Sequence, residues 1–341
     1  MIYVEDLPLT IPETSSKGNE ILPFLLEHPM LIAASNRLKE TPEKMVSFSE
    51  ESPPAKYVYV FQREYATVDP SVVEFVGTDE ATTCAGLVIR NHKTKMTSIA
   101  HMDFVEAVDL GLTQMLSSVV DGDVNATFDV HLIGSFEDMP NELVIGSNES
   151  GGRQIIPNRY SVPLCAKIVE ALQNRRERFQ LQTCCVLSHN TKRDLNGSAV
   201  PIISGFVVET SSGSVVPACF DKTSRVPDEI VRRIRVTVSS KDPYWKGRLL
   251  ETYDTLCDRI VVAPCTWMLD WGDIAFSLQQ LSDYEILMSC STSPAAEAPD
   301  FVENERRMWS YLIKYPDWRR TFTGWRPRIF DRNPKGGWSR C

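Results

Sequence analysis

The stretch TCAGLVIRNHKTKMTSIAHM, Thr83 to Met102, places two apolar, β-branched runs on either side of a short polar segment. Runs of this kind are typical of strands, and a four-residue loop at Asn91–Thr94 would join them as an antiparallel hairpin. In that register Cys84 lies directly opposite His101. Directly opposed residues have Cβ atoms about 4.5–5.5 Å apart. The stretch therefore predicts an antiparallel sheet that brings one thiol close to one imidazole.

Similar strand-like runs surround this hairpin, and separate helical segments lie between them. YVYVFQREYATV at 57–68 and NATFDVHLIGS at 125–135 are rich in β-branched and aromatic residues. VEAVDLGLTQMLSSVV at 105–120 and PDFVENERRMWSYLIKYP at 299–316 repeat apolar residues at helical spacing. Closely spaced strands need hairpins, so the pattern predicts an α+β fold with a mainly antiparallel sheet or sandwich flanked by helices.

Three segments can be distinguished along the chain. Residues 1–55 form a helical extension that ends in a linker, because SEESPPAK at 49–56 is polar and contains two adjacent prolines. Residues 56–290 carry the strand-rich α+β core, which we expect to be catalytic. Residues 291–341 carry the late helix and an Arg- and Trp-containing tail that we expect to pack on the core, so that the chain forms one globular unit.

The composition of the 341-residue chain limits its functional class. Hydrophobic residues make up 43% and charged residues 24%, as in folded globular proteins. A formal net charge of −9 argues against general nucleic-acid binding, which needs a basic face. The apolar stretch ILPFLLEHPMLIAA at 21–34 is too polar and too short to span a bilayer. We therefore predict neither a nucleic-acid partner nor a membrane, and the oligomeric state is left open.

The nine cysteines indicate free thiols in a reducing compartment. Their number is odd, their spacing is irregular and no CxxC pair occurs, so neither a disulfide framework nor a zinc site is predicted. MIYVEDLPLT at the start has no basic region followed by an apolar run, unlike a signal peptide. The expected location is the cytoplasm, with the nucleus as a further possibility.

A cysteine beside a histidine can act as a nucleophile. A neighbouring imidazolium lowers a thiol pKa, and the histidine can then protonate a leaving group and activate water. Hydroxyl groups that could orient the imidazole are supplied by Thr78, Thr82 and Thr83, and backbone N–H groups before Cys84 could bind an oxyanion. The alternative is that Cys84 is a buried, unreactive filler, which is the commoner fate of a free cysteine.

Three segments resemble the protein N-terminal asparagine amidohydrolase family. They are GTDEATTC at 77–84 with the later AHMD at 100–103, VHLIGSF at 130–136, and STSPAAEAPDFVE at 291–303. They occur in the order found in that family, and together they are specific. The family is in turn distantly similar to bacterial chemoreceptor deamidases and cytotoxic necrotizing toxins, and the resemblance implies their type of α+β fold.

The resemblance also implies catalytic residues. The deamidases and toxins share a Cys–His pair 17 residues apart, with a Thr or Ser six residues before the cysteine, and both spacings occur here. Cys84 is thereby implied as nucleophile, His101 as base and Thr78 as its partner. Animal members carry His directly after the cysteine, where this chain has Ala85, and this difference makes His101 the better choice of base.

The implied reaction is deamidation of an N-terminal asparagine of a protein or peptide to aspartate. It proceeds through a thioester, releases ammonia, requires no metal or organic cofactor, and in a eukaryotic cell feeds the N-degron pathway. The free α-amine of the substrate is largely charged at neutral pH and needs a carboxylate. Candidates from the matching segments are Asp103, Glu297, Asp79 and Glu80, and the sequence does not choose among them.

Two other functions remain open on the sequence. A thiol deamidase acting on internal glutamines of proteins would use the same Cys84, His101 and Thr78 with a different pocket. A non-catalytic module that binds protein N-termini would bind without turnover, and its Cys84 would be poorly reactive.

Overall fold

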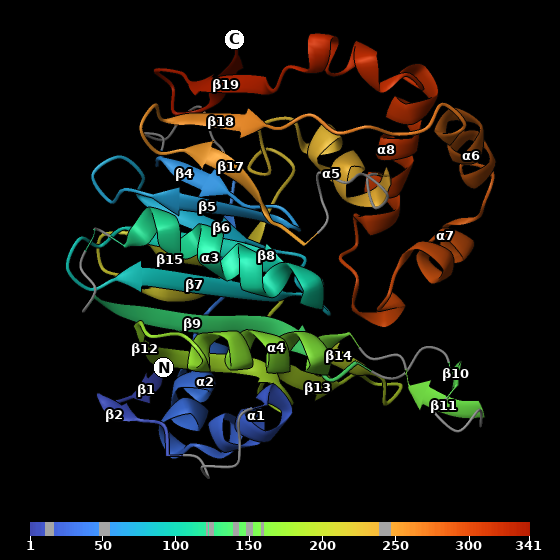
Figure 1. The fold of residues 1–341 in the computed structure, drawn as a ribbon. Helices are drawn as coiled ribbons and strands as arrows, with labels where there is room; N and C mark the ends of the chain where they lie inside the picture. Colours follow the sequence, from blue (N-terminus) through green and yellow to red (C-terminus); the bar gives the residue numbers. More distant parts are fainter. Residues whose placement is uncertain are drawn as a thin grey trace.

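A large sheet runs through the centre of the molecule, and most of its strand pairs are antiparallel (Figure 1). The computed structural model describes residues 1–10, 17–47, 55–120, 122, 126–138, 143–147, 153–157, 160–238 and 247–341. Within these ranges, eleven strands form this sheet, in the spatial order β2 (Leu7–Pro8), β1 (Ile2–Val4), β12 (Arg178–Leu187), β9 (Thr127–Phe136), β7 (Ala85–Asn91), β8 (Thr97–Met102), β5 (Glu64–Val68), β17 (Leu250–Asp254), β18 (Arg259–Val262), β19 (Arg328–Arg332) and β20 (Trp338–Arg340).

A second, smaller sheet lies behind the first in the view of Figure 1. In the described part of the chain it has five strands, ordered β3 (Lys44–Val46), β16 (Val215–Phe220), β15 (Phe206–Glu209), β6 (Phe75–Thr78) and β4 (Tyr57–Tyr59). Two hairpins lie outside both sheets, β10 (Leu143–Ser147) with β11 (Arg153–Pro157) and β13 (Thr191–Arg193) with β14 (Ala199–Pro201).

Helices cover the other face of the large sheet and gather at one of its ends (Figure 1). α3 and α4 cross the front of the sheet, and α1 packs against α4. α5 to α8 lie together beside one end of the strands. The helices are α1 (Gly18–Glu27), α2 (Pro29–Glu40), α3 (Val108–Val119), α4 (Ser161–Gln173), α5 (Glu229–Val238), α6 (Trp271–Leu278), α7 (Asp283–Cys290) and α8 (Phe301–Lys314).

The alternation of side chains along β7 explains this layering. Leu87 and Ile89 are fully buried against the helical layer, whereas Val88 between them is buried in the core shared with the smaller sheet. Successive side chains of a strand point to opposite faces, so a strand that is apolar throughout must be covered on both sides. The α+β fold with a mainly antiparallel sheet is therefore confirmed. Helices cover one face of the sheet, and the second sheet together with residues of α5 to α8 covers the other.

The N-terminal segment follows the sequence pattern. The helical extension expected within residues 1–55 is found as α1 and α2, which meet at His28. Pro29 begins α2, where a missing N–H costs nothing. Most of the expected linker, residues 49–54, lies outside the described residues. β1 and β2 add to the edge of the large sheet, so the first segment is joined to the core by strand pairing.

The ends of three strands meet beside the α5–α8 group. β7 begins there, β8 ends there, and β6 of the smaller sheet ends there as well. Loops that follow or precede these strands therefore face the helices across the end of the fold. Among the described helices, none is long and apolar enough to cross a membrane.

Candidate active site

The hairpin that carries the thiol and the imidazole forms, but its register differs from the prediction. β7 and β8 are antiparallel neighbours, and His101 pairs with Gly86 rather than with Cys84. Cys84 lies two positions earlier, just before β7 begins. The prediction of a directly opposed pair is therefore wrong, because Cys84 lies outside the β7–β8 ladder and two positions before the residue that pairs with His101.

The register shift has a local cause at Asn91. Its backbone N–H donates to Met96 O at 2.9 Å, so Asn91 belongs to the ladder and not to the loop. Its side-chain oxygen accepts from the backbone N–H groups of Lys93 and Thr94 and thereby organises the turn. Lys95 takes the left-handed conformation, with φ of 65°, that closes it. The loop still has four residues, 92–95, but it lies one residue further along the chain.

His101 is oriented by the predicted hydroxyl. Thr78, at the end of β6 in the smaller sheet, places its Oγ1 2.8 Å from His101 Nδ1. Both side chains are buried, and in the described structure His101 Nε2 has no hydrogen-bond partner. With the Nδ1 proton donated to Thr78, Nε2 keeps its lone pair and can act as a base.

Burial keeps both reactive groups neutral. It lowers the pKa of His101 to about 4, against the partly compensating charge of Asp103. Burial also raises the pKa of the Cys84 thiol well above its ordinary value, and the carboxylates of Asp103 and Glu297 raise it further. Both shifts oppose the expected thiolate–imidazolium pair, because burial leaves both charges poorly solvated. They favour a thiol beside a neutral imidazole.

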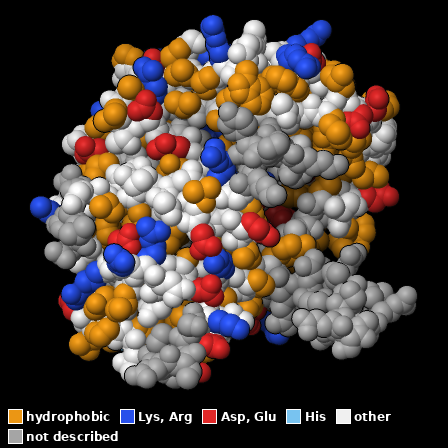
Figure 2. Space-filling view, in the orientation of Figure 1, with side chains coloured by type: hydrophobic (Ala, Val, Ile, Leu, Met, Phe, Trp, Pro, Cys, Tyr) orange, Lys and Arg blue, Asp and Glu red, His pale blue; other side chains and the backbone are white. Residues whose placement is uncertain are grey.

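Cys84 opens into a cavity of about 420 Å³ between the strand ends and the C-terminal helices. Figure 2 shows a hollow on this side of the molecule, with acidic side-chain atoms at its floor. One wall comes from the loops around 61–62, 80–84 and 103, and the opposite wall from α5 and residues 290–305. The lining residues are Phe61, Gln62, Glu80, Thr82, Thr83, Cys84, Asp103, Tyr160, Arg233, Val236, Thr237, Cys290, Ser291, Thr292, Glu297, Phe301 and Glu305.

The three sequence segments that are far apart in the chain meet at Cys84. β9 contacts the backbone of Cys84, since Ser135 N donates to Cys84 O at 2.7 Å. The segment at 291–303 contacts the loop before Cys84. Thr292 Oγ1 lies 3.3 Å from Thr83 Oγ1, and Ser293 Oγ donates to Thr82 Oγ1 at 2.9 Å. Hydroxyl contacts therefore join the loop before Cys84 to the wall at 291–293.

Two of the four predicted carboxylates line the cavity but are already paired with arginines. Asp103 accepts from Arg63 through both oxygens, with the shortest contact at 2.7 Å. Glu80 forms two parallel hydrogen bonds with Arg233, each of 2.9 Å. Such bidentate pairs satisfy both carboxylate oxygens, which leaves little capacity for a further cation.

Asp79 lies behind the cavity and does not line it. Its Oδ1 accepts from Tyr59 Oη at 2.6 Å. Its Oδ2 accepts from Phe220 N at 2.8 Å and from Arg225 at 2.9 Å. Both oxygens of Asp79 are bound to buried donors within the protein. Asp79 therefore stabilises the fold and is not placed to bind a substrate.

Glu297 lines the cavity with no ion-pair partner among the described residues. One of its oxygens accepts from Ser291 Oγ. Burial raises the pKa of its carboxyl group to about 7. Of the four predicted carboxylates, Glu297 is thus the one that lines the cavity and is held by hydroxyl contacts alone.

Glu305 is a cavity residue that the sequence reasoning did not select. It projects from α8 into the same cavity, and burial raises the pKa of its carboxyl group to about 7 as well. It lies four residues after Phe301, which also lines the cavity. Helical periodicity counted from the matched segment at 291–303 would have pointed to this position.

Comparison with known proteins identifies the family. The family model described as protein N-terminal asparagine amidohydrolase matches residues 47–340. The chain belongs to this family. The protein N-terminal asparagine amidohydrolase of Arabidopsis thaliana is 52% identical over 332 residues, which cover 96% of this chain and 94% of that protein. The amidohydrolase of Sus scrofa is 30% identical over 291 residues, or 84% of each chain, and that of Homo sapiens is 28% identical over 293 residues, also 84% of each.

The match to the amidohydrolase family spans the whole cavity. Cys84, His101 and the wall at 291–305 all fall inside 47–340, and α1 and α2 precede the matched range. Among the described residues, no group of three or more His, Cys, Asp or Glu side chains is arranged to hold a metal ion.

Proposed function

We propose that this chain hydrolyses the side-chain amide of an N-terminal asparagine in proteins or peptides, with Cys84 as the nucleophile. The observation that carries the proposal is a buried thiol in a cavity that also holds two buried carboxyl groups, Glu297 and Glu305, which form no ion pair in the described structure. A thiol that shares a cavity with two carboxyl groups outside any ion pair matches a substrate with a carboxamide and an α-ammonium group on the same residue.

In the proposed mechanism His101 acts first as a base. Its Nε2 takes the proton from the Cys84 thiol as the sulfur attacks the carboxamide carbon, so neither Cys84 nor His101 has to be charged before substrate is bound. The imidazolium then gives this proton to the departing nitrogen, and ammonia leaves a thioester on Cys84. His101 next takes a proton from water, whose oxygen attacks the thioester carbon, and returns it to the sulfur. The products are an N-terminal aspartate and the free thiol.

The loop before Cys84 supports the developing oxyanion. The backbone N–H groups of Thr83 and Cys84 have no acceptor among the described residues. The same loop is fixed elsewhere, because Ala81 N donates to Ser204 O at 2.8 Å and Thr82 O accepts from Phe136 N at 3.1 Å. A fixed loop with free N–H groups provides preorganised donors, which are among the largest contributions to acyl-transfer catalysis.

Glu297 is the proposed ligand of the α-ammonium, with Glu305 contributing a second negative charge. The raised pKa of each carboxyl group shows that the cavity wall favours its neutral form until a cation arrives. An ammonium group bound between them supplies that cation. Glutamine is one methylene longer, which packing alone would discriminate by about 1–3 kcal/mol, and displacement of its carboxamide from Cys84 adds to this difference.

Two wider inferences accompany this proposal. The order of segments and the Cys–His–Thr set support a fold relationship to the chemoreceptor deamidases and cytotoxic necrotizing toxins. The product, a protein with an N-terminal aspartate, would enter the N-degron pathway by arginylation. Both rest on the resemblance of GTDEATTC, AHMD and the late segment to the family.

Mass spectrometry of short peptides tests the proposal. A peptide that begins with Asn-Leu, its Gln-Leu counterpart and its N-acetylated form are incubated with the wild type and with Cys84→Ala. We expect a one-dalton gain and ammonia release only for the free Asn peptide, and a loss of at least about 10³-fold in the variant, as for other nucleophile deletions. Turnover of internal glutamine, or binding of the Asn peptide without any turnover, would favour one of the two alternative functions instead.

A further inference from the structure

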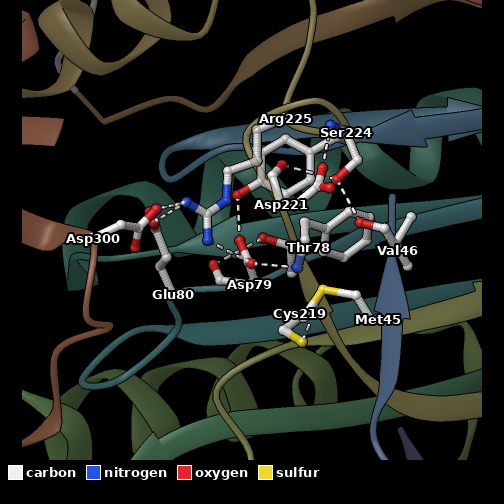
Figure 3. Close-up of polar contacts among 12 residues, drawn as sticks. Met45, Val46, Thr78, Asp79, Glu80, Cys219, Asp221, Ser224, Arg225 and Asp300 are labelled. Atoms are coloured by element: carbon white, nitrogen blue, oxygen red, sulfur yellow. Dashed lines mark hydrogen bonds and ion pairs between the residues drawn. The ribbon is translucent and has the colours of Figure 1, made fainter. Parts of the chain in front are cut away.

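A buried arginine lies directly behind the active-site loop and does not line the cavity. Figure 3 shows the guanidinium of Arg225 between three carboxylates that come from two separate parts of the chain. It contacts Asp79 at 2.9 Å, Glu80 at 2.9 Å and Asp300 at 2.9 Å. Only 5% of the Arg225 side chain is exposed, so these contacts form largely out of water.

The backbone around Arg225 is fixed by a compact turn that follows β16. Asp221 Oδ1 accepts from the backbone N–H groups of Thr223 at 2.9 Å and Ser224 at 3.0 Å. Arg225 N donates to Asp221 O, and Ser224 Oγ donates to Val46 O at 2.8 Å. The guanidinium is therefore carried on a rigid support that is hydrogen-bonded to the smaller sheet.

On one side Arg225 holds the residues that follow the catalytic threonine. Asp79 and Glu80 come directly after Thr78, whose hydroxyl orients His101. Glu80 has φ of 61°, a left-handed conformation that is uncommon for a glutamate. Its side chain is held by Arg225 and by Arg233, so these contacts stabilise the backbone bend that leads into the loop before Cys84.

On the other side Arg225 holds the start of α8. Asp300 is the N-cap residue of this helix, and its Oδ2 accepts from Arg225. The chain just before Asp300 carries Glu297, and the first turns of α8 carry Phe301 and Glu305, which all line the cavity. A single guanidinium thus links the catalytic wall of the cavity to its carboxylate wall.

The charges in this cluster make the link specific to arginine. Asp79, Glu80 and Asp300 converge on one position, and without a cation between them they would repel one another. A planar guanidinium presents several N–H groups in fixed directions and can contact three acceptors at once. A lysine ammonium at the same place keeps the positive charge, but it cannot contact all three carboxylates at once.

We propose that Arg225 is a positioning residue for the deamidation, which sets the distance between the Thr78–His101–Cys84 wall and the Glu297–Glu305 wall. This inference rests on the proposed function, because it requires Cys84 to act on a substrate whose α-ammonium is held across the cavity. Through Asp79 and Glu80, Arg225 fixes the hydroxyl that orients the base. Through Asp300, it fixes the wall that holds the amine.

Steady-state kinetics of four variants on the free Asn-Leu peptide test this proposal, with thermal unfolding measured alongside. For Arg225→Lys we expect kcat to fall about 10- to 100-fold, because displacements of about 1 Å at a distance from the chemistry have costs of that size. For Asp300→Asn, which releases only the start of α8, we expect a rise in KM of about 3- to 10-fold with a smaller change in kcat, since one charge-assisted contact is lost.

Arg332→Gln and Cys84→Ala are the controls. Arg332 is also 5% exposed and binds the carboxylate of Asp258 at 2.9 Å, but it lies on β19, away from the cavity. We expect this change to lower the unfolding temperature without altering kcat or KM at temperatures well below unfolding. If Arg225→Lys and Asp300→Asn also lowered only the unfolding temperature, Arg225 would be purely structural and the inference would be wrong.

The same set distinguishes this inference from the proposed function. An inactive wild type, or a Cys84→Ala variant as active as the wild type, would contradict the proposed function itself. An active wild type and an inactive Cys84→Ala, together with unchanged kinetics in both cluster variants, would contradict only the part assigned to Arg225. Should Arg225→Lys fail to fold, Asp300→Asn decides alone, since Asn is also a favoured N-cap residue.

Discussion

The two walls of the cavity differ in how their charges are balanced. On the wall formed by the strand ends, Asp103 and Glu80 are each bound by an arginine. On the wall formed by 291–305, neither Glu297 nor Glu305 forms an ion pair in the described structure, and burial raises the pKa of each carboxyl group to about 7 against the smaller, opposing effect of the Arg233 charge. Paired carboxylates hold a structure in place, whereas unpaired buried ones are costly and indicate that a ligand supplies the missing charge.

The four carboxylates selected from the sequence are therefore not equivalent. All four lay in matched segments, but Asp79 and Glu80 are bound to Arg225, and Asp103 is bound to Arg63. Some of these carboxylates fix a loop and another can bind a substrate. Only the three-dimensional position of the arginines distinguishes the two kinds. Three experiments examine this difference, in order of decreasing expected effect.

The first concerns the catalytic wall. Replacing the buried Thr78 by valine removes the oxygen that lies 2.8 Å from His101 Nδ1, and the imidazole loses its fixed tautomer and orientation. We expect kcat to fall about 10- to 100-fold with little change in KM, which falls within the usual contribution of a positioned base. Thr78→Ser keeps the oxygen and should retain most of the activity. A valine variant with the kcat of the wild type would show that His101 needs no such partner.

The second concerns the unpaired wall. Glu297→Gln removes the proposed partner of the α-ammonium but keeps the shape of the side chain. A hydrogen bond to a charged group contributes about 1.5–3 kcal/mol, so KM should rise about 10- to 100-fold while kcat changes less. Glu303→Gln serves as the matched control, because Glu303 lies on α8, is 61% exposed and pairs with Lys222 at the surface. An equal rise in KM for both variants would contradict the assignment of Glu297.

The third concerns pH and stability. In the folded protein the pKa of Glu297 is raised to about 7 from an ordinary value of 4.5, so its charged form destabilises the fold above pH 7. This cost disappears as the pH falls from 7 to below 4.5, because the carboxyl group is then protonated in both the folded and the unfolded chain. Glu297→Gln should therefore raise the free energy of unfolding at pH 8 by roughly 1–2 kcal/mol, and by nothing near pH 4.

Urea denaturation of the wild type and Glu297→Gln at the two pH values measures this difference. The kcat/KM of the wild type should also fall as the pH drops below about 7, because protonated Glu297 and Glu305 no longer attract an ammonium group. A variant that is less stable than the wild type at pH 8 would show that Glu297 is a structural residue after all.

Much of the fold could be predicted because it depends on local patterns. The β-branched runs on both sides of Asn91–Thr94 were sufficient to predict β7 and β8, and the helical spacing at 299–316 was sufficient to predict α8. The hairpin register was missed by two positions, because the Asn91 side chain stabilises a turn that starts one residue later. Turn geometry of this kind depends on single hydrogen bonds, which a run of polar letters does not specify. The division at residues 55 and 290 stays a prediction.

By itself the sequence determined which residues carry reactive groups and which family motifs surround them. Cys84, His101 and Thr78 were selected from spacing and resemblance, and the contact between Thr78 and His101 is present in the structure. The tertiary structure alone decided the burial that shifts the pKa of the thiol and of the imidazole, the pairing of each carboxylate, and the presence of Glu305 and Arg225 at or behind the cavity. The physical reason is that burial and charge pairing depend on neighbours distant in the chain, whereas strand and helix patterns depend on neighbours within a few residues.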